Sequence, residues 1–219
     1  MQVGAIVPAA GLSRRMGRPK PCLPWGSGTL LEHIVRTLEA SSAKPIVAVL
    51  GHEVEMVRQA HSALFSRPNI IWAYNPDYAT DEMLSSVKAG LRSLLNCPQS
   101  PALSAFLVCP VDMPLITADV VAELLRRHEE LPERILIPVY NGRKGHPVLF
   151  PMRFIHEILE LPPASPGLRA VRDAHPLDVG LVPVTCEGIL IDLDTPADYQ
   201  KWHASVKLAN TRCSRTHNT

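Results

Sequence analysis

This chain of 219 residues lacks an excess of charge, because 22 basic residues are balanced by 21 acidic ones and the formal net charge is +1. It therefore has no long-range field that would draw it onto nucleic acid. It also lacks any apolar run near the ~20 residues of a membrane-spanning helix. Its first apolar run is too short for a secretion signal and follows no basic residues. We expect a soluble cytoplasmic protein with neither a nucleic-acid nor a membrane partner.

Paired cysteines are absent as well. The cysteines are odd in number, form no Cys-x-x-Cys pair, and do not have the spacing to histidines that a zinc site needs. They are Cys22, Cys97, Cys109, Cys186 and Cys213. Such scattered thiols indicate no disulfide framework and suit a reducing cytoplasm.

The two common phosphate-loop signatures are also missing. Five residues separate Gly11 from Gly17, and proline follows Lys20, so this segment is not a Walker A loop. A Gly-x-Gly-x-x-Gly loop for dinucleotides is absent too. What the chain has instead is an apolar run of strand length, Val3–Val7, that leads into small residues and then into cations.

This first loop carries the residue types that hold a polyanion. Ala9, Ala10 and Gly11 let backbone N–H groups approach phosphate oxygens closely. Arg15 and Lys20 then supply positive charge. The sequence therefore predicts a phosphate-binding loop after the first strand, with a glycine-rich turn and surface cations as the alternative.

Apolar runs of strand length alternate with segments of helical period, a pattern typical of crossover units and a mostly parallel sheet. It predicts a three-layer α/β sandwich with a twisted sheet, as one domain over residues 1–204 before a polar tail over 205–219. Strands are expected at Val3–Val7, Ile46–Leu50, Ile70–Tyr74, Ala105–Cys109, Ile135–Val139, Pro147–Phe150, Leu181–Val184 and Ile189–Leu193. Helices are expected at Thr29–Ala40, Glu53–Leu64, Ser85–Leu95, Thr117–Glu130, Arg153–Leu159 and Pro196–Val206.

Two local patterns refine this organisation. Thr29 and Glu32 stand in capping-box register at the start of the first helix. Ile135–Tyr140 and Pro147–Phe150 flank a glycine-punctuated connection, which predicts a hairpin that departs from the parallel order. Ligands bind in open α/β sheets where the strand order reverses, so we expect a crevice there.

Carboxylates follow two of the predicted strands. Asp112 lies just past the run Phe106–Cys109, and Asp192 and Asp194 lie around the end of the last predicted strand. Two carboxylates that meet at a triphosphate suit Mg²⁺, which prefers oxygen ligands and bridges phosphates. Asp192 and Asp194 share a strand face, so either is open as the second ligand. A cap or turn role for Asp112 is the alternative.

Two further segments carry candidate substrate contacts. Asn75 follows a strand, and Ser85 and Ser86 open a helix, where hydroxyl groups can bond a base edge or a phosphate. Plain N-capping by Ser85 is the alternative. Gly145 and His146 precede a proline that restricts the backbone, and we expect an orienting or proton-sharing role for His146.

In their order along the chain, these motifs resemble the molybdenum cofactor nucleotidyltransferases. The matching segments are Ala9-Ala-Gly11, Arg15-Met-Gly17, Lys20, Gly51-His52, Asn75–Gly90, Asp112-Met-Pro-Leu115, Gly142–Pro147 and Asp192-Leu-Asp-Thr-Pro196. The resemblance implies the nucleotide-diphospho-sugar transferase fold, which is glycosyltransferase-A-like. This chain departs from the family in two places, with Glu82 where relatives carry glycine and no Gly-Asp-x-Gly element within Leu161–Arg169.

The resemblance also implies a role for each motif. It makes Arg15, Lys20 and Asp112 catalytic, and Asp112 and Asp194 the ligands of Mg²⁺. The nucleotide-binding set that it implies is Ala9, Ala10, Gly11, Arg15, Lys20, Gly51, Asn75, Ser85 and Ser86. Gly145 and His146 lie on the acceptor side in relatives.

The implied reaction moves a nucleoside monophosphate from a nucleoside triphosphate to a phosphorylated acceptor and releases pyrophosphate. The implied acceptor is molybdopterin, and a molybdoenzyme that receives the cofactor is the implied protein partner. CTP is favoured over GTP, because guanylyl relatives usually have Gly-Gly where this chain has Ala10-Gly11. Two alternatives remain: a sugar-phosphate or other small-phosphate nucleotidyltransferase, and a maturation partner that binds nucleotide or cofactor without turnover.

Overall fold

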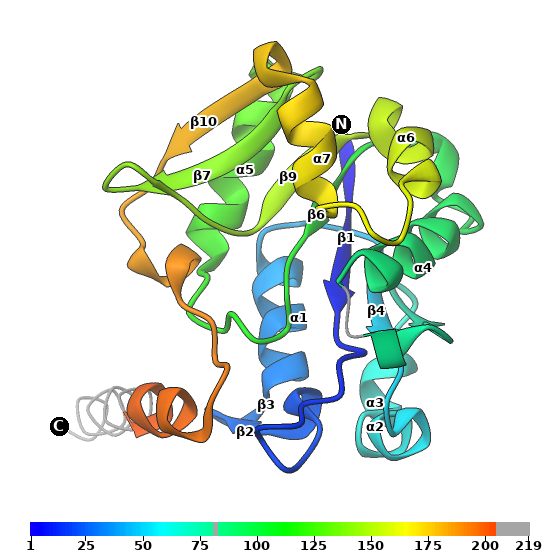
Figure 1. Cartoon of the computed structure of the whole chain (residues 1–219), viewed down its shortest axis with the longest axis vertical. Coiled ribbons are helices and arrows are strands. Elements are labelled where there is room, and N and C mark those ends of the chain that lie inside the picture. The colour runs from blue at the N-terminus through cyan, green and yellow to red at the C-terminus, as the bar shows by residue number, and fades with distance from the viewer. Residues whose placement is uncertain (81–82, 205–219) are drawn as a thin grey trace, which may run out of the picture.

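The computed structural model describes residues 1–80 and 83–204, and Glu82 and the expected tail over 205–219 lie outside the described residues. One sheet of eight strands runs through the described part (Figure 1). Its order is β10-β7-β9-β6-β1-β4-β5, with β8 paired to β7. The strands are β1 Gln2–Pro8, β4 Ile46–Leu50, β5 Ile70–Tyr74, β6 Leu103–Val108, β7 Ile135–Tyr140, β8 Arg143–Lys144, β9 Val148–Pro151 and β10 Val179–Pro183.

The sheet is mostly parallel with one reversed strand. β1 runs parallel to β4 and β6, β4 runs parallel to β5, and β7 runs parallel to β10. β9 runs antiparallel to both of its neighbours, β6 and β7. β7 turns into β8 at Asn141 and Gly142, whose φ angles of 47° and 77° suit a two-residue hairpin turn. The predicted departure from the parallel order is therefore confirmed.

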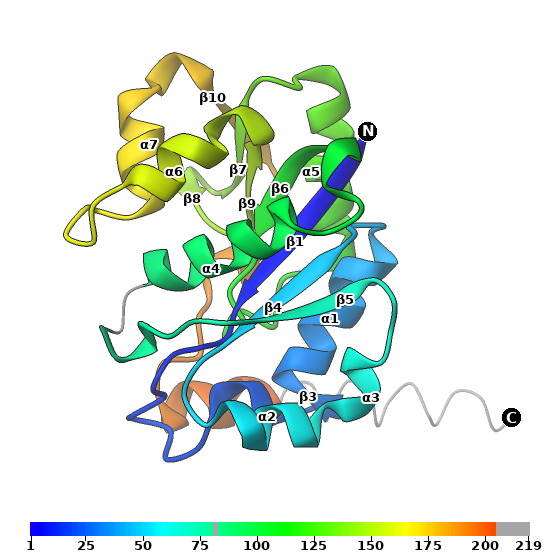
Figure 2. The same ribbon diagram turned by 90° about the vertical axis from the view of Figure 1, so that its right-hand side faces the viewer.

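Helices cover both faces of the sheet, which confirms the three predicted layers (Figure 2). Side chains alternate along β1, so Val7 packs into the core on one face and Ile6 into the core on the other. The face of Val7 carries α1 Leu30–Ala40, α2 Val54–Ala60, α3 Ser62–Phe65 and α5 Ala118–Glu130. The face of Ile6 carries α4 Met83–Leu95, α6 Ile155–Glu160 and α7 Leu168–Ala174. Among the described residues, no helix has the length and apolar character to cross a membrane.

Short elements complete the chain. They are the strands β2 Pro24–Trp25 and β3 Gly28–Thr29, which pair with each other, and the 3-10 turns η1 Lys20–Cys22, η2 Tyr78–Thr80, η3 Ser100–Ala102, η4 Met152–Phe154, η5 Pro176–Asp178 and η6 Glu187–Leu190. A last helix covers 196–204. The predicted helix over Pro196–Val206 is thus confirmed as far as residue 204.

The capping box predicted for the first helix is confirmed, and two further helices also carry side-chain caps. The Thr29 hydroxyl accepts the N–H of Glu32, and the Glu32 carboxylate accepts the N–H of Thr29, which together form a capping box. Thr117 caps α5 through its side chain. Thr195 and Asp198 repeat the reciprocal pattern at the start of the last helix. These bonds satisfy amide groups that a helix N-terminus otherwise leaves unpaired.

Two predicted elements are wrong. Ile189–Leu193 forms no strand, because η6 ends at Leu190 and the sheet edge beside β7 is already occupied by β10. The predicted helix Glu53–Leu64 is broken at His61, which leaves helical geometry at a φ of −118° and a ψ of 25°. The ring of His61 is buried and links the Val57 carbonyl to the Thr29 hydroxyl. Helix α7 is not among the predicted elements.

Candidate active site

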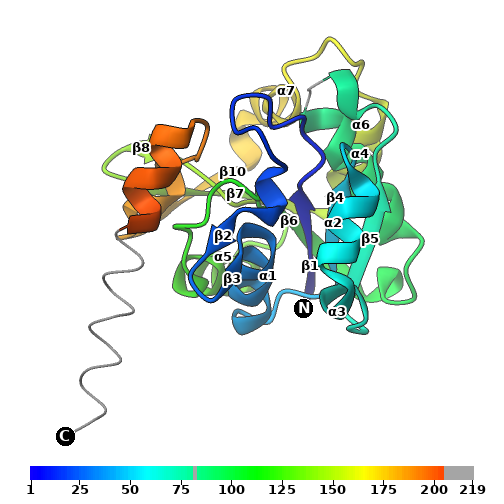
Figure 3. The ribbon, with the colours of Figure 1, turned by 90° about the horizontal axis from the view of Figure 1, so that it is seen from below.

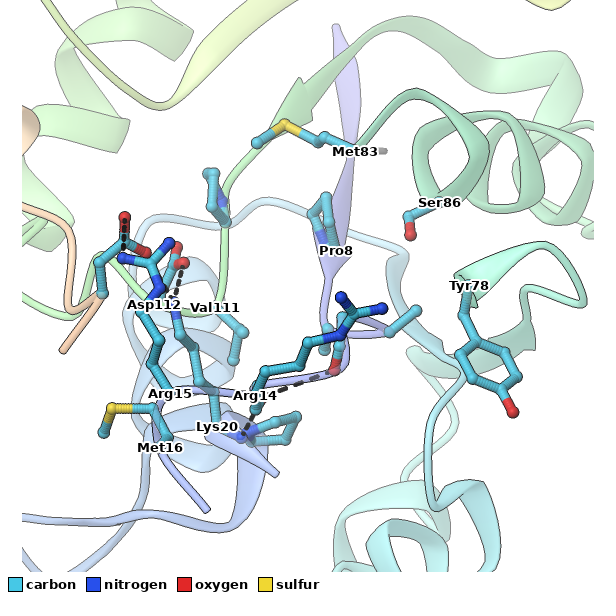
Figure 4. Close-up of a pocket in the computed structure, with 17 residues that line it drawn as sticks. Pro8, Arg14, Arg15, Met16, Lys20, Tyr78, Met83, Ser86, Val111 and Asp112 are labelled. Atoms are coloured by element: carbon cyan, nitrogen blue, oxygen red, sulfur yellow. Dashed lines mark hydrogen bonds and ion pairs between the residues drawn. The ribbon is translucent and has the colours of Figure 1, made fainter. Parts of the chain in front are cut away.

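A cavity of about 550 Å³ opens at the carboxyl ends of β1 and β6 (Figure 4). Ligands bind at such strand ends in open α/β sheets. The predicted site residues that line it are Ala9, Ala10, Gly11, Arg15, Lys20, Ser86, Asp112 and Asp194. The other lining residues, which sequence reasoning missed, are Pro8, Ser13, Arg14, Met16, Pro21, Tyr78, Met83, Pro110 and Val111.

The loop after β1 folds back on itself to form one wall of the cavity. Seen from below, this loop, in dark blue, lies between α4 and the last helix, in orange (Figure 3). Ser13 adopts a left-handed backbone with a φ of 49°, and its hydroxyl accepts the backbone N–H of Lys20 at 3.0 Å. Its carbonyl oxygen also accepts the N–H of Met16 at 2.8 Å. Ser13 therefore closes the loop and brings Lys20 into the cavity.

Lys20 joins the two predicted metal ligands. Its Nζ lies 2.8 Å from Asp112 Oδ2 and 2.9 Å from Asp194 Oδ1. The Lys20 side chain is 15% exposed, so it is largely withdrawn from water. Burial disfavours its charge, but the carboxylates of Asp112 and Asp194 outweigh burial and hold the pKa of Lys20 above its ordinary value. The ammonium is therefore charged at neutral pH.

The donor set at this point fits a hard divalent cation. Asp112 and Asp194 turn one carboxylate oxygen each toward a common position, and oxygen is the ligand that Mg²⁺ prefers. Among the described residues, no group of three or more His, Cys, Asp or Glu side chains could hold a metal ion. Such a pair with few protein ligands suits a metal that keeps water and shares phosphate oxygens. Asp192 is exposed and lies outside the lining of this cavity.

The two adjacent arginines extend in different directions. Arg15 Nη1 lies 4.0 Å from Asp194 Oδ2, on the acidic side of the cavity. Arg14 points toward the side that carries Tyr78 and Ser86 (Figure 4). Sequence reasoning selected only Arg15, although the run of two arginines in a loop was a visible signal for both.

The opposite wall rests on a buried asparagine. Asn75 is 1% exposed, and its Nδ2 donates to Ser85 Oγ at 2.9 Å and to Ser86 Oγ at 3.1 Å. Its Oδ1 accepts the N–H of Asp77 at 3.0 Å. Asn75 thus orients both serines without lining the cavity itself. Helix α4 begins at Met83, so Ser85 lies within its first turn rather than at the N-cap.

Gly51 also lies behind the cavity wall. A Cβ atom there would come within 2.5 Å of Tyr78 Cβ and 2.8 Å of Ala10 Cβ. The next residue, His52, donates its N–H to the Ala10 carbonyl at 3.1 Å and packs its ring on Tyr78 at a centroid distance of 5.9 Å. Gly51 therefore lets the segments of Tyr78 and Ala10, both in the cavity lining, approach each other.

Gly145 and His146 lie outside the cavity lining, and the His146 ring lies within electrostatic reach of Asp112 and Asp192. A Cβ atom at Gly145 would come within 2.2 Å of the Ile189 carbonyl oxygen, so only glycine fits this close approach. The His146 N–H donates to the same oxygen at 3.0 Å. Burial lowers the pKa of His146, against an opposing effect from the carboxylates of Asp112 and Asp192. The imidazole is therefore neutral at neutral pH.

The sequence of this chain is similar to those of known nucleotidyltransferases. Residues 5–179 match a family model described as the MobA-like NTP transferase domain. The chain is 29% identical over 198 residues to the molybdenum cofactor cytidylyltransferase of Escherichia coli, across 90% of this chain and 93% of that protein. It is 34% identical over 150 residues to a probable molybdenum cofactor guanylyltransferase of Mycobacterium avium, across 67% of each chain.

A solved structure shares the fold. The structure of Rv0371c from Mycobacterium tuberculosis superimposes with a TM-score of 0.74 at 22% identity, across 93% of this chain and 99% of that one. Another structure of Rv0371c is a complex with manganese. The expected nucleotide-diphospho-sugar transferase fold is confirmed by the mostly parallel sheet and by these similarities.

Proposed function

The chain belongs to the family of MobA-like NTP transferase domains and is a nucleotidyltransferase, and we propose that it moves a nucleoside monophosphate from CTP to molybdopterin. The observation that carries this proposal is the convergence of the Lys20 ammonium with the carboxylates of Asp112 and Asp194, in a cavity that the small residues Ala9, Ala10 and Gly11 also line. With a divalent cation on the two carboxylates, that constellation would bind and neutralise polyphosphate. It offers no group for an acyl or redox reaction.

The proposed reaction needs no protein nucleophile. A phosphate oxygen of the acceptor attacks the α-phosphorus in line and forms the new P–O bond. The bond from the α-phosphorus to the oxygen that bridges to the β-phosphate then breaks, and pyrophosphate leaves with the electron pair. Cys109 is the cysteine nearest in sequence to Asp112, and burial raises the pKa of its thiol to about 12, which keeps it unreactive.

Positioning and charge neutralisation are the tasks of the chain's own residues. We assign the β- and γ-phosphates to Arg15, Lys20 and the backbone N–H groups of Ala10 and Gly11. Asp112 and Asp194 would hold Mg²⁺, which when bound supplies charge stabilisation at the reacting phosphate. Manganese in the Rv0371c structure supports a divalent metal of this kind.

The two substrates are assigned to opposite sides of the site. Ser85 and Ser86, oriented by Asn75, are proposed to contact the base or ribose, and Gly145 and His146 to face the acceptor. The cytidylyltransferase similarity across nine-tenths of the chain supports CTP and molybdopterin. The guanylyltransferase similarity covers only two-thirds of the chain, but it makes GTP the competing nucleotide. A molybdoenzyme recipient and a cytoplasmic location stay predictions.

Pyrophosphate release tests the proposal directly. The protein is incubated with each of the four nucleoside triphosphates and Mg²⁺, with molybdopterin, with a sugar phosphate and with no acceptor. We expect release with CTP and molybdopterin, and loss of it when EDTA removes the metal. Release only with a sugar phosphate would favour the small-phosphate alternative. Tight nucleotide binding without any release would favour a carrier that binds without turnover.

A further inference from the structure

Lys20, Asp112 and Asp194, the three charged groups that meet in the site, stand outside the large sheet. η1 carries Lys20, the loop after β6 carries Asp112, and the stretch after η6 carries Asp194. Strand pairing alone therefore does not fix the distances among them. One backbone bond joins two of these segments, because the Leu193 N–H donates to the Asp112 carbonyl oxygen at 2.8 Å.

A cluster of four rings lies beside these segments. It consists of Trp25, His33, Tyr199 and His203, and we call it the Trp25 cluster. The other ring centroids lie 6.0 to 6.3 Å from that of Trp25, and Tyr199 stacks on His203 at 4.9 Å. Trp25 is 1% exposed, so the cluster is anchored in the hydrophobic core. Figure 1 shows the last helix, in orange, next to β2.

Tyr199 bridges two of the charged segments. Its hydroxyl donates to the Pro24 carbonyl oxygen at 2.6 Å. Pro24 lies four residues after Lys20, and Tyr199 lies five residues after Asp194. This one hydrogen bond therefore ties the helix that follows Asp194 to the strand that follows Lys20.

His33 fixes the third segment. Its Nε2 donates to the Pro114 carbonyl oxygen at 2.8 Å, two residues after Asp112. Burial lowers the pKa of His33, so the ring stays neutral and offers an N–H group without adding charge near the carboxylates. Because His33 stands on α1, it connects the Asp112 loop to a helix that is itself held by a capping box.

We propose that Tyr199 and His33 are positioning residues, which hold the two site carboxylates at the spacing where both meet the Lys20 ammonium. This inference rests on the proposed function, because it assigns a task within the same site. The hydrogen bonds to Pro24 and Pro114 end on main-chain oxygens, so they set the place of the backbone rather than of a substrate.

The variant Tyr199→Phe keeps the ring and removes only the hydroxyl. We expect kcat for pyrophosphate release to fall roughly ten- to hundredfold, since a small displacement of a catalytic group costs that much. Mn²⁺ followed by electron paramagnetic resonance in the presence of CTP should bind more weakly, while KM for the acceptor stays unchanged. Tyr74→Phe is the matched control, because Tyr74 is 47% exposed on the edge strand β5.

His33 gives a second and independent pair of variants. His33→Gln keeps an N–H donor and should retain most of kcat and of the Mn²⁺ affinity. His33→Leu fills similar space without a donor and should lose both. A rescue by glutamine that leucine does not give separates the hydrogen bond from simple packing.

Two outcomes would overturn the inference that Tyr199 and His33 are positioning residues. Wild-type kcat and Mn²⁺ affinity in Tyr199→Phe and His33→Leu would overturn the inference. Lower melting temperatures with unchanged Mn²⁺ affinity of the folded variants would overturn it too, because the role would then be structural only. Failure of the proposed function is distinguishable, since the wild-type protein itself would release no pyrophosphate with any nucleotide and acceptor.

Discussion

The Lys20 ammonium lies 2.8 Å from Asp112 Oδ2, so a cation of the first loop neutralises a carboxylate that follows the strand β6. The same ammonium lies 2.9 Å from Asp194 Oδ1. Two carboxylates so close together would repel each other without a cation between them. A divalent metal bound by the same pair of oxygens would therefore compete with Lys20, and the oxygens of a bound triphosphate would offer Lys20 another partner.

Lys20→Met tests this competition. We expect the affinity for Mn²⁺ without nucleotide to rise roughly tenfold, an effect of about 1.4 kcal/mol. Pyrophosphate release should fall by orders of magnitude, because a charge that stabilises the leaving group is lost. Titration calorimetry measures the first effect, and Lys44→Met, on an exposed residue before β4, is the control. Unchanged Mn²⁺ binding would mean that Lys20 does not occupy the metal position.

Three conservative variants distinguish the roles of the aspartates. Asp112→Asn and Asp194→Asn should each lower kcat by roughly a hundredfold or more, because a lost metal ligand removes several kcal/mol of charge stabilisation. Asp192→Asn should keep near wild-type kcat, because Asp192 is exposed and outside the cavity lining. Circular dichroism checks that each variant folds. The assignment of Asp194 fails if Asp192→Asn is the more damaging change.

The two arginines should act on different parts of the nucleotide. Arg15→Ala should weaken binding of CTP more than binding of CMP, because Arg15 lies on the side of Lys20 and the acids. Arg14→Ala should weaken the binding of CTP and of CMP to a similar degree, because Arg14 points toward Tyr78 and Ser86 (Figure 4). Calorimetry with CTP and CMP makes the comparison. If Arg15→Ala lowered the affinities for CTP and CMP equally, Arg15 would not contact the leaving pyrophosphate.

The division into two substrate sides predicts separable kinetics. Ser86→Ala should raise KM for the nucleotide or change the preference among bases, because Ser86 lines the cavity beside Asn75. His146→Ala should chiefly raise KM for the acceptor. Initial rates at varied concentrations of both substrates distinguish the two effects. The reverse pattern would show that the orientation proposed for the site is wrong.

A buried histidine far from the site should make stability depend on pH. His128 is fully buried, and its Nε2 bonds to Ser104 Oγ at 3.0 Å, while its Nδ1 has no partner among the described residues. Burial lowers the pKa of His128 below its ordinary value of 6.5, so protonation favours the unfolded chain. The stability that the neutral ring contributes is present above pH 6.5 and is lost as the pH falls through the lower folded-state pKa.

Urea unfolding at pH 7.5 and pH 5.5 measures this loss. His128→Gln keeps a donor for Ser104 and does not titrate, so its free energy of unfolding should fall less than that of the wild type over the same range. An equal fall in both proteins would assign the acid sensitivity to other groups.

Many of the strands and helices were predictable because short sequence patterns determine where they begin and end. Apolar strands with both faces buried, such as Ile46–Leu50, stand out as continuous runs, and the structure has this strand at the same bounds. The capping box of Thr29 and Glu32 fixed a helix start from four residues. The strand predicted at Ile189–Leu193 was wrong because a short apolar run has the same sequence pattern whether it joins a sheet or packs beside one. Only the neighbouring strands decide between the two.

Residue type and order along the chain by themselves determined the α/β class and the likeness to the nucleotidyltransferases, and they gave the prediction of a phosphate-binding first loop, because all three depend on chemistry within short segments. The tertiary structure alone decided that Asp194, rather than Asp192, shares Lys20 with Asp112. It alone brought Tyr199 to Pro24, across 175 positions of chain. Contacts between distant segments follow from how the whole core packs, and no local pattern encodes them.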